Sequence, residues 1–262
     1  MLYIRLFRRT VEFIMQNIPI LLDIHTHSLA SGHGSRDTIT DMARAAADAS
    51  LEILGISDHG PATPGSGSSS YFRNLRLADR RLYGVNLLYG AELNILNQNG
   101  DVDLDDELIG TLDYALVSMH PDTFRSGSAV SNTQAFINAM RHPRVRFLGH
   151  PDDGRFPVDY ERLLSMAKEH HVFPELNNSS LMPQAFRKDG LRNSATILAI
   201  CKKLRLPVLL SSDSHGTSHL GDMRYILPLL EQCNFPQELI INSDPALLYR
   251  ILGKSFTKKQ SI

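Results

Sequence analysis

The sequence predicts an α/β fold in which seven parallel strands close, or nearly close, into a single barrel. Seven short apolar runs have the length of strands, and stretches with helical periodicity lie between them. Such alternation is typical of βαβ units. At 262 residues and 42% hydrophobic, the chain is long enough for one (β/α) barrel. A doubly wound open sheet is the alternative, but nothing in the chain resembles the glycine-rich phosphate turn of that fold.

Each apolar run ends in a polar cluster. In chain order, the runs with their clusters are Leu21–His27, Ile53–Gly60, Leu87–Asn94, Tyr114–Pro121, Val145–Pro151, Val172–Ser180 and Pro207–His215. Six clusters carry His, Asp or Glu, whereas Val172–Ser180 ends in the amides and hydroxyls of Asn177, Asn178 and Ser179, which either bind a substrate oxygen or cap a helix. Because the carboxyl ends of barrel strands meet at one mouth, we expect the clusters to converge there.

Five stretches predict helices, each beginning near a capping residue. They are Thr38–Ser50, Asn132–Met140, Val158–His171, Asn193–Arg205 and Gly221–Cys233. Pro61–Asn74 predicts a flexible loop, either a lid over a site or a solvated linker. We expect one barrel domain over residues 20–252, with an N-terminal extension (1–19) and a C-terminal tail (253–262).

Composition disfavours several functional classes. The formal net charge of −1 provides no basic surplus for long nucleic acids. No apolar run reaches the roughly 20 residues that span a bilayer, and the N-terminal stretch lacks the features of a signal peptide. Cys201 and Cys233 lie in helix-like stretches, which favours buried thiols in a reducing, cytoplasmic compartment over a disulfide.

The polar clusters have the composition of a multinuclear metal site. Asp23, His25 and His27 share one face of a strand, because side chains alternate along it. A lone histidine is usually an ordinary core or surface group, but burying many unpaired polar groups together is costly. The metal-competent residues at this mouth are His25, His27, His33, His59, Glu92, His120, His150, Asp213 and His215. We expect Asp23 and Asp58 to orient ligands by accepting an imidazole N–H, surface charge being the alternative.

Four histidines lack this context. His142, His170 and His171 lie at helix ends or turns and are interpreted as structural, while the role of His219 stays open.

The ordered motifs resemble the PHP (polymerase and histidinol phosphatase) superfamily, and most closely its YcdX-like phosphatase branch. They are Asp-x-His-x-His, Ser-Asp-His, a Glu after the third strand, Met-His-Pro, Gly-His-Pro and Ser-Asp-Ser-His, distributed over Ile20–Leu252. The resemblance implies a distorted (β/α)7 TIM-like barrel that holds three metals at the carboxyl ends of its strands. Zinc is the expected metal, with manganese or iron as alternatives, and relatives often assemble as trimers.

The resemblance also implies which residues hold each metal. His25, His27, Glu92 and Asp213 would hold the first; Glu92, His120 and His150 would hold the second; His33, His59 and His215 would hold the third. In this reading Glu92 bridges the first two metals.

Such a centre predicts a phosphatase for phosphomonoesters of small molecules, because three cations attract a phosphate dianion. A hydroxide bridging the first two metals would attack phosphorus. Arg73, Arg155 and Arg187 either clamp phosphate or lie on the surface. The alternatives are a phosphodiesterase or nuclease of the same superfamily, a non-catalytic metal-binding scaffold, and an amidohydrolase, which is disfavoured because no strand-end cluster contains a lysine.

Overall fold

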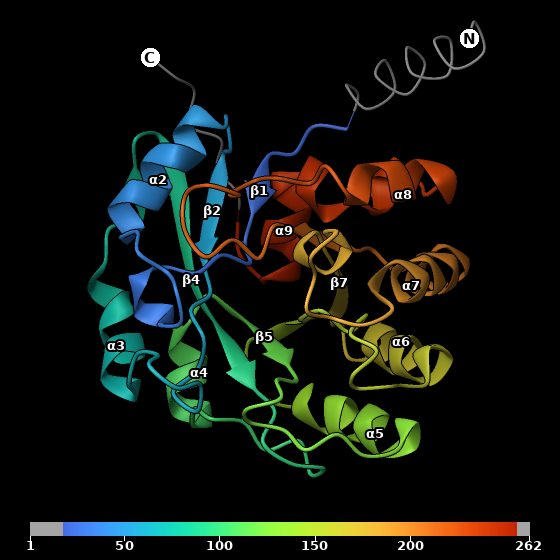
Figure 1. Ribbon diagram of the computed structural model, residues 1–262. Coiled ribbons are helices and arrows are strands. Elements are labelled where there is room, and N and C mark those ends of the chain that lie inside the picture. The colour runs from blue at the N-terminus through green and yellow to red at the C-terminus, as the bar shows by residue number, and fades with distance from the viewer. Residues whose placement is uncertain (1–17, 256–262) are drawn as a thin grey trace, which may run out of the picture.

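The structure, a computed structural model, describes residues 18–255 as a parallel sheet surrounded by helices (Figure 1). The parallel strands are β1 (Leu22–Asp23), β2 (Ile53–Ile56), β4 (Val85–Asn94), β5 (Tyr114–Ser118), β6 (Val145–Leu148), β7 (Phe173–Asn177) and β8 (Leu209–Ser211). They are hydrogen-bonded in that order, and β3 (Arg81–Leu82) adds an antiparallel pair to β4. The seven predicted strands are confirmed. Most of the predicted N-terminal extension and C-terminal tail lies outside the described residues.

The sheet closes between β1 and β8 by contacts just beyond the strands. The N–H of Asp213 donates to the carbonyl of His25 at 3.0 Å, and the N–H of His27 donates to the carbonyl of Ser214 at 2.8 Å. Near the start of β1, the side chain of Asn242 bridges Leu22 and Leu210. The sheet is therefore nearly closed as a barrel, as the sequence predicts.

Eight α-helices occur among residues 18–255. They are α2 (Ile39–Asp48), α3 (Ser69–Asn74), α4 (Asp106–Thr111), α5 (Ala129–Ala139), α6 (Tyr160–Glu169), α7 (Gly190–Leu204), α8 (Ile226–Gln232) and α9 (Pro245–Ile251). Between these elements lie the single 3₁₀ turns η1 (Leu29–Ser31), η2 (Leu75–Leu77), η3 (Ser179–Leu181), η4 (Gln237–Leu239) and η5 (Ile241–Ser243). The helices lie around the outside of the strands (Figure 1).

The five predicted helices are confirmed, although their ends differ by several residues. The start of α2 is fixed by a capping box in which Thr38 and Asp41 each bond the other's backbone N–H. Three short helices, α3, α4 and α9, were not predicted. The prediction of Pro61–Asn74 as a loop was wrong for its last six residues, which form α3. Burial of Phe72 stabilises this helix, a tertiary contact that local composition does not reveal.

The barrel interior below the mouth is filled by side chains from opposite strands. Tyr114 on β5 donates from its phenol to the carbonyl of Ile24, which follows β1. Since β2 and β4 lie between β1 and β5 in the sheet, the Tyr114 ring crosses the barrel. Gly90 leaves room for it, because a Cβ there would lie 2.7 Å from the ring. This packed layer forms a floor under the carboxyl ends of the strands.

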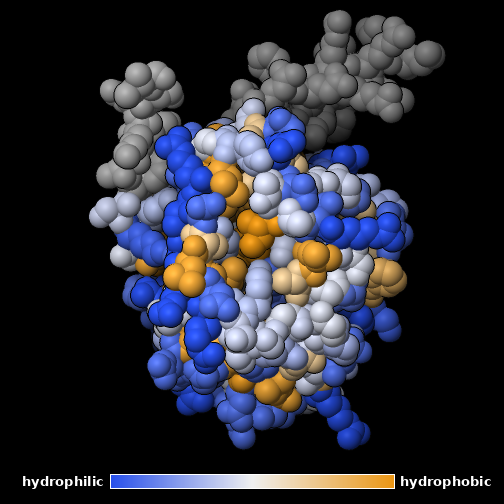
Figure 2. Space-filling model, turned by 90° about the vertical axis from the view of Figure 1, so that its left-hand side faces the viewer, coloured by the Kyte–Doolittle hydropathy of each residue, from blue (hydrophilic) through white to orange (hydrophobic). Residues whose placement is uncertain are grey.

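The outer surface of the barrel faces water. Figure 2 shows mainly hydrophilic residues on one side of the molecule, with hydrophobic residues gathered in small separate groups between them. Among the described residues, no helix combines the length and the apolar character needed to cross a bilayer. Cys201 is buried, Cys233 is half-buried, and both are free thiols, as expected.

Candidate metal centre

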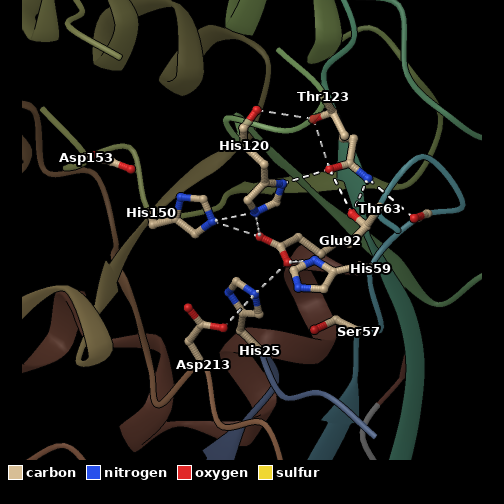
Figure 3. A network of polar contacts seen from close by, with 12 residues as sticks. His25, Ser57, His59, Thr63, Glu92, His120, Thr123, His150, Asp153 and Asp213 are labelled. Carbon is tan, nitrogen blue, oxygen red and sulfur yellow. Dashed lines mark hydrogen bonds and ion pairs between the residues drawn. The ribbon is translucent and has the colours of Figure 1, made fainter. Parts of the chain in front are cut away.

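Glu92, at the carboxyl end of β4, lies fully buried at the centre of the converging side chains (Figure 3). Its Oε1 lies 2.8 Å from His150 Nε2 and 3.3 Å from His120 Nε2. The two Nε2 atoms are 3.2 Å apart. These three residues make up the second metal set implied by the resemblance, and the barrel brings their donor atoms together.

The other carboxylate oxygen of Glu92 faces the side chains that follow β1 and β8. Oε2 lies 3.4 Å from His25 Nε2 and 3.6 Å from His27 Nε2. Asp213 Oδ1 lies 3.6 Å and 3.1 Å from the same two nitrogens. These are the residues of the implied first metal set, so the two oxygens of Glu92 face two different groups of donors.

The third implied set is more open to solvent. The ring centroid of His33 lies 4.7 Å from the centroid of His59 and 4.7 Å from that of His215. The centroids of His59 and His215 are 5.6 Å apart. His59 is buried, His215 is half-buried and His33 is exposed. The ligand atoms of His27, His59 and His215 also lie within 4.8 Å of one another, so His27 adjoins this outer group as well.

The donor atoms have the arrangement that a group of cations requires. Five buried atoms of these residues have no hydrogen-bond partner among the described residues: His25 Nε2, His59 Nδ1, His59 Nε2, Glu92 Oε2 and His215 Nε2. His59 Nδ1 lies 2.6 Å from Glu92 Oε2 without forming a hydrogen bond to it. Unpaired buried polar atoms are costly unless something binds them. Ligands of a tetrahedral zinc ion are about 3.3 Å apart, close to the spacings in the first two sets. The residues present therefore fit divalent cations.

Hydrogen bonds to Nδ1 orient two of the imidazoles with Nε2 toward the mouth. The Nδ1 of His120 lies 2.7 Å from Asn94 Oδ1. The NH₂ group of Asn94 donates to Asp103 at 2.6 Å, so Oδ1 is an acceptor and Nδ1 of His120 is the donor. The Nδ1 of His215 donates to the carbonyl of Asp213 at 3.2 Å. Such bonds fix the tautomer that leaves Nε2 free to bind a metal.

The two predicted orienting aspartates act differently from expectation. Asp58 accepts from the Ser31 hydroxyl at 2.7 Å, and Ser31 Oγ in turn accepts from His27 Nδ1 at 2.8 Å. Asp58 therefore orients His27 through a serine and not directly. Asp23 accepts from the hydroxyl of Ser212 and from the N–H of Gly221, and it bonds no imidazole. The expectation of direct contact with a histidine ring was wrong for both.

Burial favours neutral imidazoles at His27 and His120, and the carboxylates of the site stay ionised. Burial lowers the pKa of His27 well below its ordinary value, and it lowers the pKa of His120 to about 4. Burial would also lower the pKa of His25, but Glu175, Glu92 and Asp213 raise it well above its ordinary value. Burial alone would raise the pKa of Glu92, but the imidazoles of His59, His25 and His120 lower it well below its usual range. Burial would likewise raise the pKa of Asp213, but Arg187 and His25 lower it. Neutral imidazoles and ionised carboxylates are the ligand forms that bind cations.

Of the three predicted arginines, Arg187 and Arg155 line a cavity and Arg73 lies on the surface. The cavity has a volume of about 570 Å³, and His33, Asp213 and His215 form its wall on the side of the donor groups. Arg187 donates to Asp213 at 2.7 Å, whereas Arg155 is paired with Asp153 at 2.6 Å. Arg187 thus lies beside the donor groups and lines the cavity in which a small molecule could bind.

Sequence reasoning missed Glu175, which lies inside the apolar run Val172–Ser180. It is fully buried on β7, and its Oε1 lies 2.5 Å from His25 Nδ1. The run was classified by the amides that follow it. A carboxylate within a buried parallel strand was itself a signal, because a buried charge requires partners.

His142, His170 and His171 lie away from the mouth, in connections that precede strands. His142 contacts Asp106 at 2.5 Å, while His170 and His171 follow the end of α6. These positions agree with structural roles. His219, whose role the sequence left open, is exposed.

A protein-family model and several relatives match most of this chain. The family model described as PHP domain matches residues 23–206. A protein of Clostridium acetobutylicum named "Probable phosphatase" is 37% identical over 224 residues, which cover 86% of this chain and 91% of that protein. A protein of the same designation from Caldanaerobacter subterraneus subsp. tengcongensis is 37% identical over 227 residues, covering 86% and 88%.

Solved structures share the fold. Histidinol phosphate phosphatase from Lactococcus lactis, complexed with zinc, L-histidinol and phosphate, superposes with a TM-score of 0.58 at 15% identity, covering 83% of this chain and 95% of that one. A structure described among metal-dependent tyrosine phosphatases of Bacillus subtilis and Streptococcus pneumoniae gives a TM-score of 0.53 at 16% identity, covering 91% and 97%. At such identities the likeness concerns the fold alone.

Proposed function

The chain belongs to the PHP domain family, and from this premise we propose that it is a metal-dependent phosphatase acting on phosphomonoesters of small molecules. The observation that carries the proposal is the set of unpaired donor atoms around Glu92. Relatives at 37% identity are named as phosphatases, and a structural neighbour was solved with zinc and phosphate. Both facts support the same chemistry.

We propose that the mouth holds three divalent cations, zinc being favoured because imidazoles predominate among the donors. His25, His27, Glu92 and Asp213 would hold the first; Glu92, His120 and His150 the second; His33, His59 and His215 the third. When bound, the cations neutralise charge on phosphoryl oxygens and lower the pKa of a water molecule toward neutrality.

The chain's own residues supply binding and orientation. The guanidinium of Arg187, kept beside Asp213, would bind a phosphoryl oxygen and stabilise the charge that builds up during its transfer. Asp213 keeps this guanidinium in place by pairing with Nη2 at 2.7 Å, and Asn177 Oδ1 accepts from Nη1 at 3.2 Å. A cavity of about 570 Å³ beside the donors fits the organic part of a small metabolite.

Hydrolysis of p-nitrophenyl phosphate and of bis(p-nitrophenyl) phosphate tests the proposal. We expect turnover of the monoester with added Zn²⁺ or Mn²⁺, loss of turnover after chelation, and recovery when metal is restored. Preferential turnover of the diester would favour a phosphodiesterase. Bound zinc without hydrolysis of any ester in a broad panel of phosphorylated metabolites would favour a non-catalytic scaffold. The homo-oligomer implied by the resemblance stays a prediction, which light scattering can test.

A further inference from the structure

Glu175 lies beneath the donor atoms and forms hydrogen bonds with both carboxylate oxygens. Its Oε1 accepts from His25 Nδ1 at 2.5 Å and from the hydroxyl of Ser211. Its Oε2 accepts from the backbone N–H of His150 at 2.5 Å and from Asn177 Nδ2 at 3.2 Å. The side chain is fully buried and does not line the cavity beside the donor groups, so it does not meet a substrate.

The contact with His25 decides which nitrogen of that ring faces the mouth. A carboxylate accepts hydrogen bonds only, so Nδ1 carries the proton. Nε2, which has no hydrogen-bond partner among residues 18–255, is then the nitrogen that faces Glu92 and Asp213 and that is available to a cation. A carboxylate partner also makes the imidazole a stronger ligand.

The contact with His150 supports an unusual backbone conformation. His150 has a φ of 28°, in the left-handed region, which costs a non-glycine residue about 1–3 kcal/mol. Its N–H is bonded to Glu175 Oε2, and its ring reaches Glu92 at 2.8 Å from this conformation. The carboxylate thereby helps to keep the His150 ring directed at the centre.

A third connection runs through Asn177 to Asp213. The amide of Asn177 donates to Glu175 at 3.2 Å and to Asp213 at 3.1 Å. Asp213 also has a positive φ, of 53°. Glu175 therefore contacts, directly or through one amide, side chains or backbone that follow β1, β6 and β8.

We propose that Glu175 is a positioning residue that holds His25, His150 and Asp213 in the arrangement that binds cations. The inference rests on the metal centre proposed above but not on the reaction. A carboxylate is required, because four donors converge on its two oxygens. A glutamine would turn an NH₂ group toward two of these donors.

Zinc affinity of Glu175→Gln, measured by competition with a chromophoric chelator, tests the proposal. We expect zinc to bind about 10- to 100-fold more weakly than to the unaltered chain. Asp152→Asn is the matched control, because Asp152 is equally buried near the mouth but its carboxylate bonds the hydroxyls of Ser180 and Ser194 and no histidine ring. Its zinc affinity should stay within twofold of the unaltered chain.

Melting temperatures with and without zinc separate positioning from a purely structural role. If Glu175 positions ligands, the zinc-induced rise in Tm shrinks in Glu175→Gln, since ligand binding stabilises in proportion to affinity. Equal losses of Tm in both forms, with zinc affinity unchanged, would overturn the proposal. A chain that binds no divalent cation would overturn it as well. Because no turnover is measured, failure of the phosphatase reaction alone would give a different result.

A measurement on the unaltered chain covers the case in which the variant does not fold. In zinc-loaded protein with ¹⁵N-labelled histidine, we expect His25 to carry its proton on Nδ1 and none on Nε2. The opposite tautomer would contradict the proposal.

Discussion

Two regions of the barrel differ in whether their buried polar groups have hydrogen-bond partners. Near the start of β1, Asn242 is fully buried and fully bonded: its amide donates to the carbonyls of Leu22 and Leu210, both at 2.8 Å, and its Oδ1 accepts from the N–H of Leu210 at 2.7 Å. At the mouth, His25 Nε2 and Glu92 Oε2 are equally buried but have no hydrogen-bond partner among the described residues.

The difference distinguishes polar groups that stabilise the fold from polar groups that are available to bind a cation. The bonds of Asn242 replace strand pairing where β1 and β8 are not directly bonded, so this amide stabilises barrel closure. The unpaired atoms at the mouth destabilise the metal-free chain and become favourable only when a cation binds them. Variants in the two regions should therefore affect different measurements.

The largest effect is expected for Glu92→Gln at the mouth. The amide cannot supply two anionic oxygens to the two donor groups, so kcat/KM for p-nitrophenyl phosphate should fall by about 10³-fold or more. Near-native turnover would show that Glu92 does not bridge two cations.

Asn242→Ala should have the opposite profile. The change leaves three backbone groups without their partner, and a buried unpaired group costs about 1–3 kcal/mol, so we expect a loss of about 3 kcal/mol in the free energy of unfolding. Urea titration measures it. Zinc affinity of the folded variant should not change. Asn99→Ala, at an exposed position, is the control and should be neutral. A stability loss below about 0.5 kcal/mol would contradict the proposed role of Asn242 in closure.

Arg187→Gln tests the ion pair between Arg187 and Asp213 at the mouth, which is formed without metal. Hydrogen bonds to charged groups contribute about 1.5–3 kcal/mol, so kcat/KM should fall about 10- to 100-fold, and inhibition by inorganic phosphate should weaken similarly. Arg192→Gln removes an exposed arginine and should change neither value. Unchanged phosphate inhibition in Arg187→Gln would rule out its role in anion binding.

Tyr71→Phe should give the smallest effect. The Tyr71 hydroxyl donates to Asp58, which reaches His27 only through Ser31, and Asp58 keeps its bonds to Ser28 and Ser31. We expect a loss of about 1 kcal/mol in stability and less than a threefold change in zinc affinity. Tyr89→Phe removes a hydroxyl bonded to the Asp79 carbonyl, away from the mouth, and should reduce stability alone. A tenfold loss of zinc affinity in Tyr71→Phe would show stronger coupling through Asp58.

Much of the candidate site followed from residue type and position. Strand-length apolar runs located β1 to β8 apart from β3. The alternation along Asp23, His25 and His27 predicted side chains on one strand face, but β1 covers only Leu22–Asp23, and of the three only the two imidazoles face Glu92. The short helices α3, α4 and α9 were missed, because helices of six or seven residues depend on tertiary packing more than on propensity.

The sequence by itself determined which chemical groups stand at the strand ends, because burial and side-chain alternation follow from local pattern. Only the tertiary structure decided which groups meet. His25 and Glu175 are 150 positions apart, and Asp58 bonds Ser31 instead of an imidazole. Hydrogen-bond partners depend on distances of a few tenths of an ångström between strands that are adjacent only after the barrel closes. No local pattern encodes such distances.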